Sequence, residues 1–164
     1  MPLSTSDLTR LGGAAIVIQS ASVPNVYLRM DGMGVVTPTA PGGGKVNCQR
    51  GINDFTVFLL QPQPDGTYAV ESAAYPNVFL RMDAGTISAG APIGGTVNCQ
   101  SGAGRSEKFI IAPQPGGSMS FVSANFQGVY LRMVPGTGTA PGGTVNCQIN
   151  GGGAPNTTFF LDLA

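Results

Sequence analysis

The segments Val26-Tyr27-Leu28-Arg29-Met30 and Lys45-Val46-Asn47-Cys48-Gln49 form a pair that occurs three times in this chain. In each copy an aromatic-Leu-Arg-Met segment is followed by a turn rich in glycine and then by Val-Asn-Cys-Gln. The other two copies are Val78-Phe79-Leu80-Arg81-Met82 with Thr96-Val97-Asn98-Cys99-Gln100, and Val129-Tyr130-Leu131-Arg132-Met133 with Thr144-Val145-Asn146-Cys147-Gln148. The recurrence predicts internal pseudo-threefold symmetry.

The spacing of the copies predicts the domain organisation. The three arginines are 52 and then 51 residues apart in a chain of 164 residues. A period this long, present only three times, favours one closed domain over an open solenoid of stacked repeats. We therefore expect a single domain, 1–164, with repeats at about 14–64, 65–115 and 116–164.

Four short strands are predicted in each repeat. The chain has 25 glycines and 13 prolines, which separate runs of β-branched and aromatic residues and leave no room for long helices. The predicted strands are 15–20, 26–30, 45–49 and 55–60 in repeat one, 67–72, 78–82, 96–100 and 108–111 in repeat two, and 119–123, 129–133, 144–148 and 158–161 in repeat three. These twelve strands predict an all-β domain in which a closed barrel removes exposed sheet edges.

The order of these motifs resembles the β-trefoil superfamily. The resemblance covers 14–163 and lies in a first strand that ends in Ser-Ala, the aromatic-Leu-Arg second strand and a late aromatic residue in strand four, such as Phe58. The Tyr27-Leu28-Arg29 motif is similar to that of fascin-like and arabinose-binding trefoils, and the short chain is similar to small fungal and bacterial trefoil lectins. The chain has no tryptophan, so it lacks the Gln-x-Trp motif of ricin-type trefoils.

The alternation of strand residues predicts which side chains leave the core. Leu28 and Met30 share one face of their strand, so Arg29 lies on the other face, because unpaired guanidinium groups inside a small barrel would be too costly to desolvate. The same parity places the cysteines inside and the amides outside. Each repeat should thus present an outward polar patch: Arg29, Asn47 and Gln49; Arg81, Asn98 and Gln100; Arg132, Asn146 and Gln148.

Acidic and aromatic residues extend this patch. Asp31 and Asp83 follow the first two arginines, and Tyr75 and Phe126 precede the second strand of repeats two and three, where repeat one has Val23. Amides, a guanidinium, a carboxylate and a ring are the groups that bind sugar hydroxyls and the C–H faces of sugars. The chain is therefore expected to have up to three sugar sites. Repeat three should differ, since it has no such aspartate and a shorter turn.

A purely architectural interpretation fits the same residues. The amides can satisfy backbone groups in long loops, the arginine can pair with Asp31 as a brace, and both aspartates can be turn residues. The cysteines are expected to be small buried core residues. With no histidine and no Cys-x-x-Cys, neither a metal site nor a disulfide framework is predicted. Phe58, Phe109 and Phe159 are predicted to lie in the core.

Composition limits the classes of function. Eight basic and eight acidic residues provide no charge pattern for nucleic acid or for a membrane, and neither partner is predicted. Without histidine or paired carboxylates, no enzyme and no cofactor are predicted. We expect a non-catalytic lectin that binds glycoproteins or glycolipids multivalently and agglutinates glycan-coated surfaces. The alternatives are a protease inhibitor and a fascin-like structural module.

Two further expectations concern the setting of the protein. The amino terminus has no basic leader and no apolar segment of the length of a secretory signal, so a cytoplasmic location is expected. The sparse charge and the 42% hydrophobic content are compatible with a homodimer.

Overall fold

A closed ring of six antiparallel strands forms the centre of the molecule. The computed structural model describes residues 1–38, 41–136, 141–151 and 153–164. The ring strands, in order of pairing, are β1 (Ala15–Ser20), β4 (Val57–Pro62), β5 (Tyr68–Ser72), β9 (Phe109–Pro113), β10 (Met119–Ser123) and β13 (Phe159–Leu163), which pairs again with β1. The ring therefore has no free edge.

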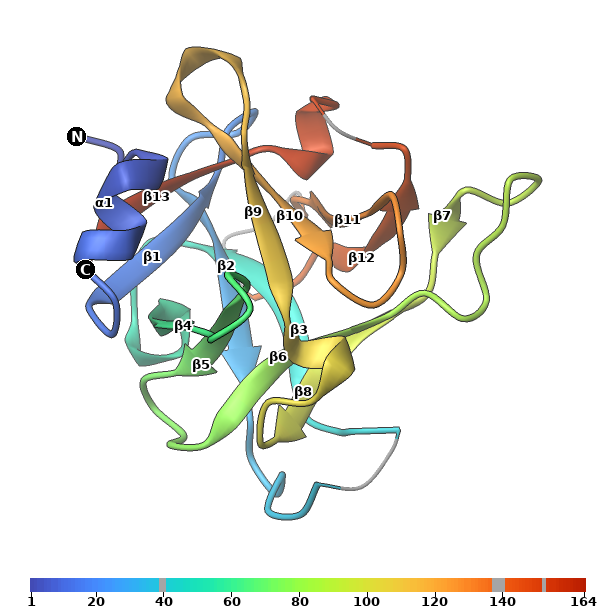
Figure 1. The fold of residues 1–164 in the computed structure, drawn as a ribbon, viewed down its shortest axis with the longest axis horizontal. Helices are drawn as coiled ribbons and strands as arrows, with labels where there is room; N and C mark the ends of the chain where they lie inside the picture. Colours follow the sequence, from blue (N-terminus) through green and yellow to red (C-terminus); the bar gives the residue numbers. More distant parts are fainter. Residues whose placement is uncertain (39–40, 137–140, 152) are drawn as a thin grey trace.

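Three hairpins attach to this barrel, one in each repeat. They are β2 (Val26–Asp31) with β3 (Lys45–Arg50), β6 (Val78–Asp83) with β8 (Thr96–Ser101), and β11 (Val129–Val134) with β12 (Thr144–Ile149). In each hairpin the arginine stands directly opposite the asparagine of the partner strand. β3, β8 and β12 also contact one another, so the hairpins meet around the pseudo-threefold axis. Residues 32–38 after β2 and residues 84–92 after β6 project from the body of the molecule (Figure 1).

The twelve predicted strands are confirmed, with ends that agree to within two residues. The predicted strand 55–60 begins too early, because its first two residues belong to a short 3-10 helix. The elements that the sequence did not predict are η1 (Asp54–Thr56), η2 (Arg105–Glu107), η3 (Pro115–Gly117), η4 (Pro155–Thr157), the short strand β7 (Ile93–Gly94) and the helix α1 (Thr5–Arg10).

The helix α1 begins with a capping box that is visible in the sequence as Ser-x-x-Asp. The Ser4 side chain accepts a hydrogen bond from the Asp7 backbone N–H at 3.4 Å, and the Ser4 N–H donates to the Asp7 carboxylate at 2.8 Å. Leu8 is buried and joins the main core. Both chain ends lie near α1 (Figure 1), because the Leu3 N–H donates to the Leu161 carbonyl at 2.7 Å.

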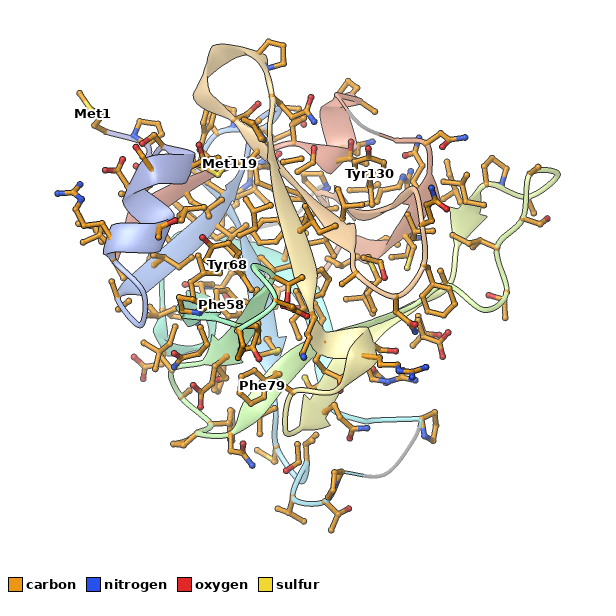
Figure 2. The ribbon with its side chains drawn as sticks, viewed as in Figure 1. Met1, Phe58, Tyr68, Phe79, Met119 and Tyr130 are labelled. Atoms are coloured by element: carbon orange, nitrogen blue, oxygen red, sulfur yellow. The ribbon has the colours of Figure 1, made fainter. Side chains whose placement is uncertain are left out.

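Aromatic and aliphatic side chains fill the barrel. Phe58, Phe109 and Phe159 are fully buried, which confirms their predicted place in the core. Phe121 lies between two of them, with ring centroids 6.2 Å from Phe109 and 5.8 Å from Phe159 in edge-to-face geometry. Figure 2 labels Phe58 and Met119 among the side chains that fill the space between the strands.

Each cysteine packs against a glycine pair of the preceding repeat, and we call these contacts the cysteine–glycine seam. Gly43 exchanges two backbone hydrogen bonds with Cys99, at 2.8 and 2.9 Å. The seam consists of Gly43 and Gly44 with Cys99, Gly94 and Gly95 with Cys147, and Gly142 and Gly143 with Cys48. The seam thus joins repeat one to repeat two, repeat two to repeat three, and repeat three to repeat one. All three cysteines are buried and free, as predicted.

The seam thiols should be unreactive in the folded protein. Burial raises the pKa of Cys99 and of Cys147 to about 12 and also raises the pKa of Cys48. At about pH 8 the folded protein should therefore hold almost no thiolate, the form that reacts with iodoacetamide. Mass spectrometry should find no alkylation of the native chain and three alkylated sites after denaturation. Fast labelling of the native chain would contradict this picture.

Candidate functional site

The repeated arginine and asparagine bind each other across each hairpin. The Nη1 atoms of Arg29, Arg81 and Arg132 donate to the Oδ1 atoms of Asn47, Asn98 and Asn146 at 3.3, 3.3 and 3.2 Å, respectively. The three pairs have nearly the same geometry. They join the two strands of each hairpin, and this contact fits the architectural interpretation of the motif.

The aspartates of repeats one and two extend the same brace. Arg81 Nη2 lies 3.0 Å from Asp83 Oδ2, and Arg29 Nη2 lies 3.8 Å from Asp31 Oδ2. The other oxygen of each aspartate accepts a backbone N–H two residues later, at 2.9 Å from Gly85 for Asp83 and at 3.1 Å from Met33 for Asp31. Both are therefore turn residues as well as ion-pair partners. Repeat three has Val134 at this position.

The prediction that the polar patch faces solvent is wrong for four of its residues. Arg81 is only 6% exposed, and Asn47, Gln49 and Gln100 are also buried. These side chains leave the barrel core as strand alternation predicts, but other segments cover them. The turn of repeat one lies over repeat two, where Asn98 Nδ2 donates to the Pro41 carbonyl at 3.0 Å. The remaining residues of the patch, Arg29, Arg132, Asn98, Asn146 and Gln148, are half-buried.

Tyr75 lies beside repeat one and not in the patch of repeat two, where the sequence placed it. Its ring stacks on Phe55, with centroids 5.9 Å apart and planes 14° apart. The Arg29 guanidinium carbon lies 4.9 Å from the centre of the Phe55 ring. Burial, and then the charge of Asp31, raise the pKa of Tyr75. We call Arg29, Asp31, Phe55 and Tyr75 the ring cluster.

An open hollow of about 420 Å³ lies on the two segments that hold these rings. It is lined by Asp54, Val57, Ala73 and Ala74, and we call it the Asp54 hollow. The Ala73 N–H donates to the Val57 carbonyl at 3.1 Å and fixes the two segments together. The volume of the Asp54 hollow is in the range of small-molecule sites. Asp54 and Phe55 are not among the site residues predicted from the sequence, which placed Phe55 at the start of the strand 55–60, whereas both residues belong to η1.

A pseudo-equivalent hollow of about 230 Å³ lies between repeats two and three. It is lined by Asp65, Arg105, Lys108, Ala124 and Asn125. Lys108 Nζ lies 3.9 Å from Asp65 Oδ2, so this hollow has basic as well as acidic groups at its wall. The two hollows therefore share a place in the fold but differ in charge.

Neither a metal-binding cluster nor a membrane-spanning helix is found among the described residues. Within residues 1–38, 41–136, 141–151 and 153–164, no three histidine, cysteine or acidic side chains form a group that could hold a metal ion. No helix in these ranges is sufficiently long and apolar to cross a bilayer.

Comparison with solved structures identifies the fold. The Vibrio vulnificus hemolysin/cytolysin β-trefoil lectin, solved with N-acetyl-D-lactosamine bound, matches 92% of this chain and 96% of its own, with a TM-score of 0.56 and 15% identity. The designed threefold-symmetric protein ThreeFoil matches 91% of this chain and 99% of its own, with a TM-score of 0.70 and 18% identity. The fold is a β-trefoil.

The similar structures include proteins named as lectins. Polyporus squamosus lectin, solved with a sialylated influenza-binding epitope, matches 93% of this chain and 49% of its own, with a TM-score of 0.68 and 19% identity. This chain thus spans about half the length of that lectin. No protein-family model and no curated protein matches the sequence.

The three repeats of this trefoil differ in aromatic content. The positions of Phe55 and Tyr75 hold Ser106 and Phe126 at the next repeat boundary. At the boundary between repeats three and one they hold Asn156 and Val23. The number of rings therefore falls from two to one to none.

Proposed function

We propose that this trefoil is a non-catalytic carbohydrate-binding protein whose main sugar site is the Asp54 hollow together with the stacked rings of Phe55 and Tyr75. The observation that favours it most is the ring pair, which is only half-buried and lies on the segments that line the hollow. The similarity to trefoils solved with bound saccharides supports the same class of ligand.

The groups at this site have the chemistry that a sugar requires. A half-exposed ring can pack against the C–H face of a pyranose, and the exposed Asp54 carboxylate can accept hydrogen bonds from two hydroxyls. Arg29 and Asp31 contribute by holding the rings, since the arginine lies over Phe55 and the aspartate is close to Tyr75. In the proposed mechanism they position the platform and do not touch the sugar.

The proposal also assigns an order to the sites. The boundary between repeats one and two has both rings, and the boundary between repeats two and three has Phe126 alone. We propose one main site and one weaker site, which together bind a glycan-coated surface more tightly than a single sugar. The third boundary, without a ring, is not proposed as a site.

Replacement of Tyr75 by alanine should weaken sugar binding by about tenfold, because the stacked platform is lost. A glycan array would first identify the ligand, and calorimetry with that glycan would then compare the wild type with Tyr75→Ala. Ile110→Ala is the matched control, because Ile110 is an exposed apolar residue of β9 that lines neither hollow. An array without any bound glycan, or unchanged affinity of Tyr75→Ala, would refute the proposal.

A further inference from the structure

The glutamines of repeats one and two are equivalent in sequence but differ in their partners. In repeat one, Gln49 Oε1 accepts a hydrogen bond from Asn53 Nδ2 at 3.2 Å, and Gln49 Nε2 donates to the Gly51 carbonyl at 3.3 Å. In repeat two, Gln100 is 8% exposed, and its buried Oε1 has no partner among the described residues. A buried oxygen without a hydrogen bond is costly, so this one calls for an explanation.

The cause is a change of one residue at the start of the 3-10 helix. Asn53, which precedes η1, is replaced by Gly104 before η2, so the amide that would bind Gln100 is absent. Glu107 stands where repeat one has Thr56, and its Oε1 accepts the Gly104 N–H at 3.0 Å. Repeat two therefore has a glycine and a carboxyl group where repeat one has an amide and a hydroxyl.

Glu107 is a second buried acceptor without a cationic partner. It is 4% exposed, and no lysine or arginine of the described residues lies within 4.0 Å of its carboxylate. Burial raises the pKa of Glu107, and the hydrogen bond from the Gly104 N–H and then the charge of Arg81 oppose this effect only in part. The Arg81 guanidinium is already bound to Asp83 and Asn98. Buried carboxylates are rare unless they are paired.

Gln100 and Glu107 both line one hollow of about 340 Å³. Its wall includes Gln100, Ser101, Gly104 and Glu107 from repeat two and Pro38 from the turn of repeat one, and we call it the Gln100 hollow. Arg105 and Lys108, the other charged residues near Glu107 in the chain, line the hollow between repeats two and three instead. The Gln100 hollow therefore combines a carboxyl group that has no cationic partner, an amide oxygen that has no hydrogen-bond partner among the described residues, and room for a small molecule.

We propose that the Gln100 hollow binds the primary ammonium group of a small polar ligand. An ammonium group has three donors and no acceptor, which matches two buried acceptors in one hollow. A carboxylate also binds a cationic donor more strongly than a neutral hydroxyl. The site is separate from the Asp54 hollow, and this inference does not depend on the proposed sugar site.

D-glucosamine and D-glucose are suitable probes, since they differ by one ammonium group in place of a hydroxyl. Titration followed by NMR, with the side-chain amide signals of Gln100 as the reporter, should show binding of glucosamine at least about tenfold tighter than binding of glucose. Glu107→Gln should lose most of that preference, and Asp162→Asn, which removes a carboxylate on β13, should keep it. Equal affinity for both sugars, or no shift with glucosamine, would overturn the proposal.

A second variant closes the hollow without removing either acceptor. Gly104 has φ of −96°, which other residues also adopt, and a Cβ there would lie 3.1 Å from Glu107 Oε1, so a small shift of that side chain lets Gly104→Asn restore the arrangement of repeat one. Its side chain should bind Gln100 Oε1, abolish glucosamine binding and leave the melting temperature equal or higher. Gly104→Ala, which has no amide, should retain most of the binding. Unchanged binding by a folded Gly104→Asn protein would also overturn the proposal.

The Tyr75→Ala protein distinguishes this site from the sugar site. It should bind glucosamine at the Gln100 hollow as the wild type does, whether or not the glycan array finds a ligand for the Asp54 hollow. A parallel loss of both activities in Tyr75→Ala would contradict the separation of the two sites.

Discussion

Gly44→Ala is expected to lower the free energy of unfolding by about 3 kcal/mol, and the melting temperature by about 10 °C. Gly44 has φ of +67°, a conformation that alanine adopts only with strain. A methyl group on its Cα would also lie 2.6 Å from the Asp31 carbonyl oxygen and 2.8 Å from Cys99 Sγ. Either the backbone or the cysteine would have to move, and the seam between repeats one and two would open.

Gly51→Ala separates the two causes. Gly51 has a similar φ of +77°, but a methyl group there would meet no atom within 4 Å. This variant should lose only about 1 kcal/mol, the cost of the backbone conformation alone. Urea unfolding of both variants provides the measurement. Equal losses would show that the close approach of Gly44 to Cys99 contributes nothing to stability.

Phe121→Ala is expected to be still more destabilising, by about 4 kcal/mol. The Phe121 ring is fully buried and lies between Phe109 and Phe159 in the core, so its removal leaves a cavity between repeats two and three. Ile110→Ala should cost well under about 1 kcal/mol, because Ile110 lies on the adjacent strand and points to solvent. Calorimetric melting would measure both. A loss for Phe121→Ala as small as that for Ile110→Ala would contradict the assigned core.

The sequence was sufficient for the fold because the signals of a trefoil are local. Each strand is a short apolar run between glycine or proline clusters, and the same pattern recurs in all three repeats. Strand parity also separated Leu28 and Met30, which are fully buried, from Arg29. The capping box of α1 is an equally local signal, Ser4-x-x-Asp7, but the strand pattern does not include it.

The candidate site depends on contacts between segments that are distant in the sequence. The alternation of side chains along a strand does not predict such contacts. Strand alternation predicts that Arg81 points away from the barrel core. It does not predict that the turn of repeat one, which contains Gly42, covers Arg81. In the same way, the position of Tyr75 before its strand does not tell which repeat its ring will touch. The sequence likewise does not show that the Gln100 oxygen has no partner. That follows from the structure, in which Asn53 binds Gln49 in repeat one and Gly104 offers Gln100 no such amide.

The cysteine–glycine seam has no first and no last member. Each repeat both receives a glycine turn and supplies one, and the third repeat passes its turn back to the first through Cys48 and Gly142. The two ends of the chain meet between β1 and β13, where the Ala164 N–H donates to the Ala15 carbonyl at 2.9 Å. The three repeats thus form a closed ring of equivalent contacts, although the polypeptide connects them covalently at only two places.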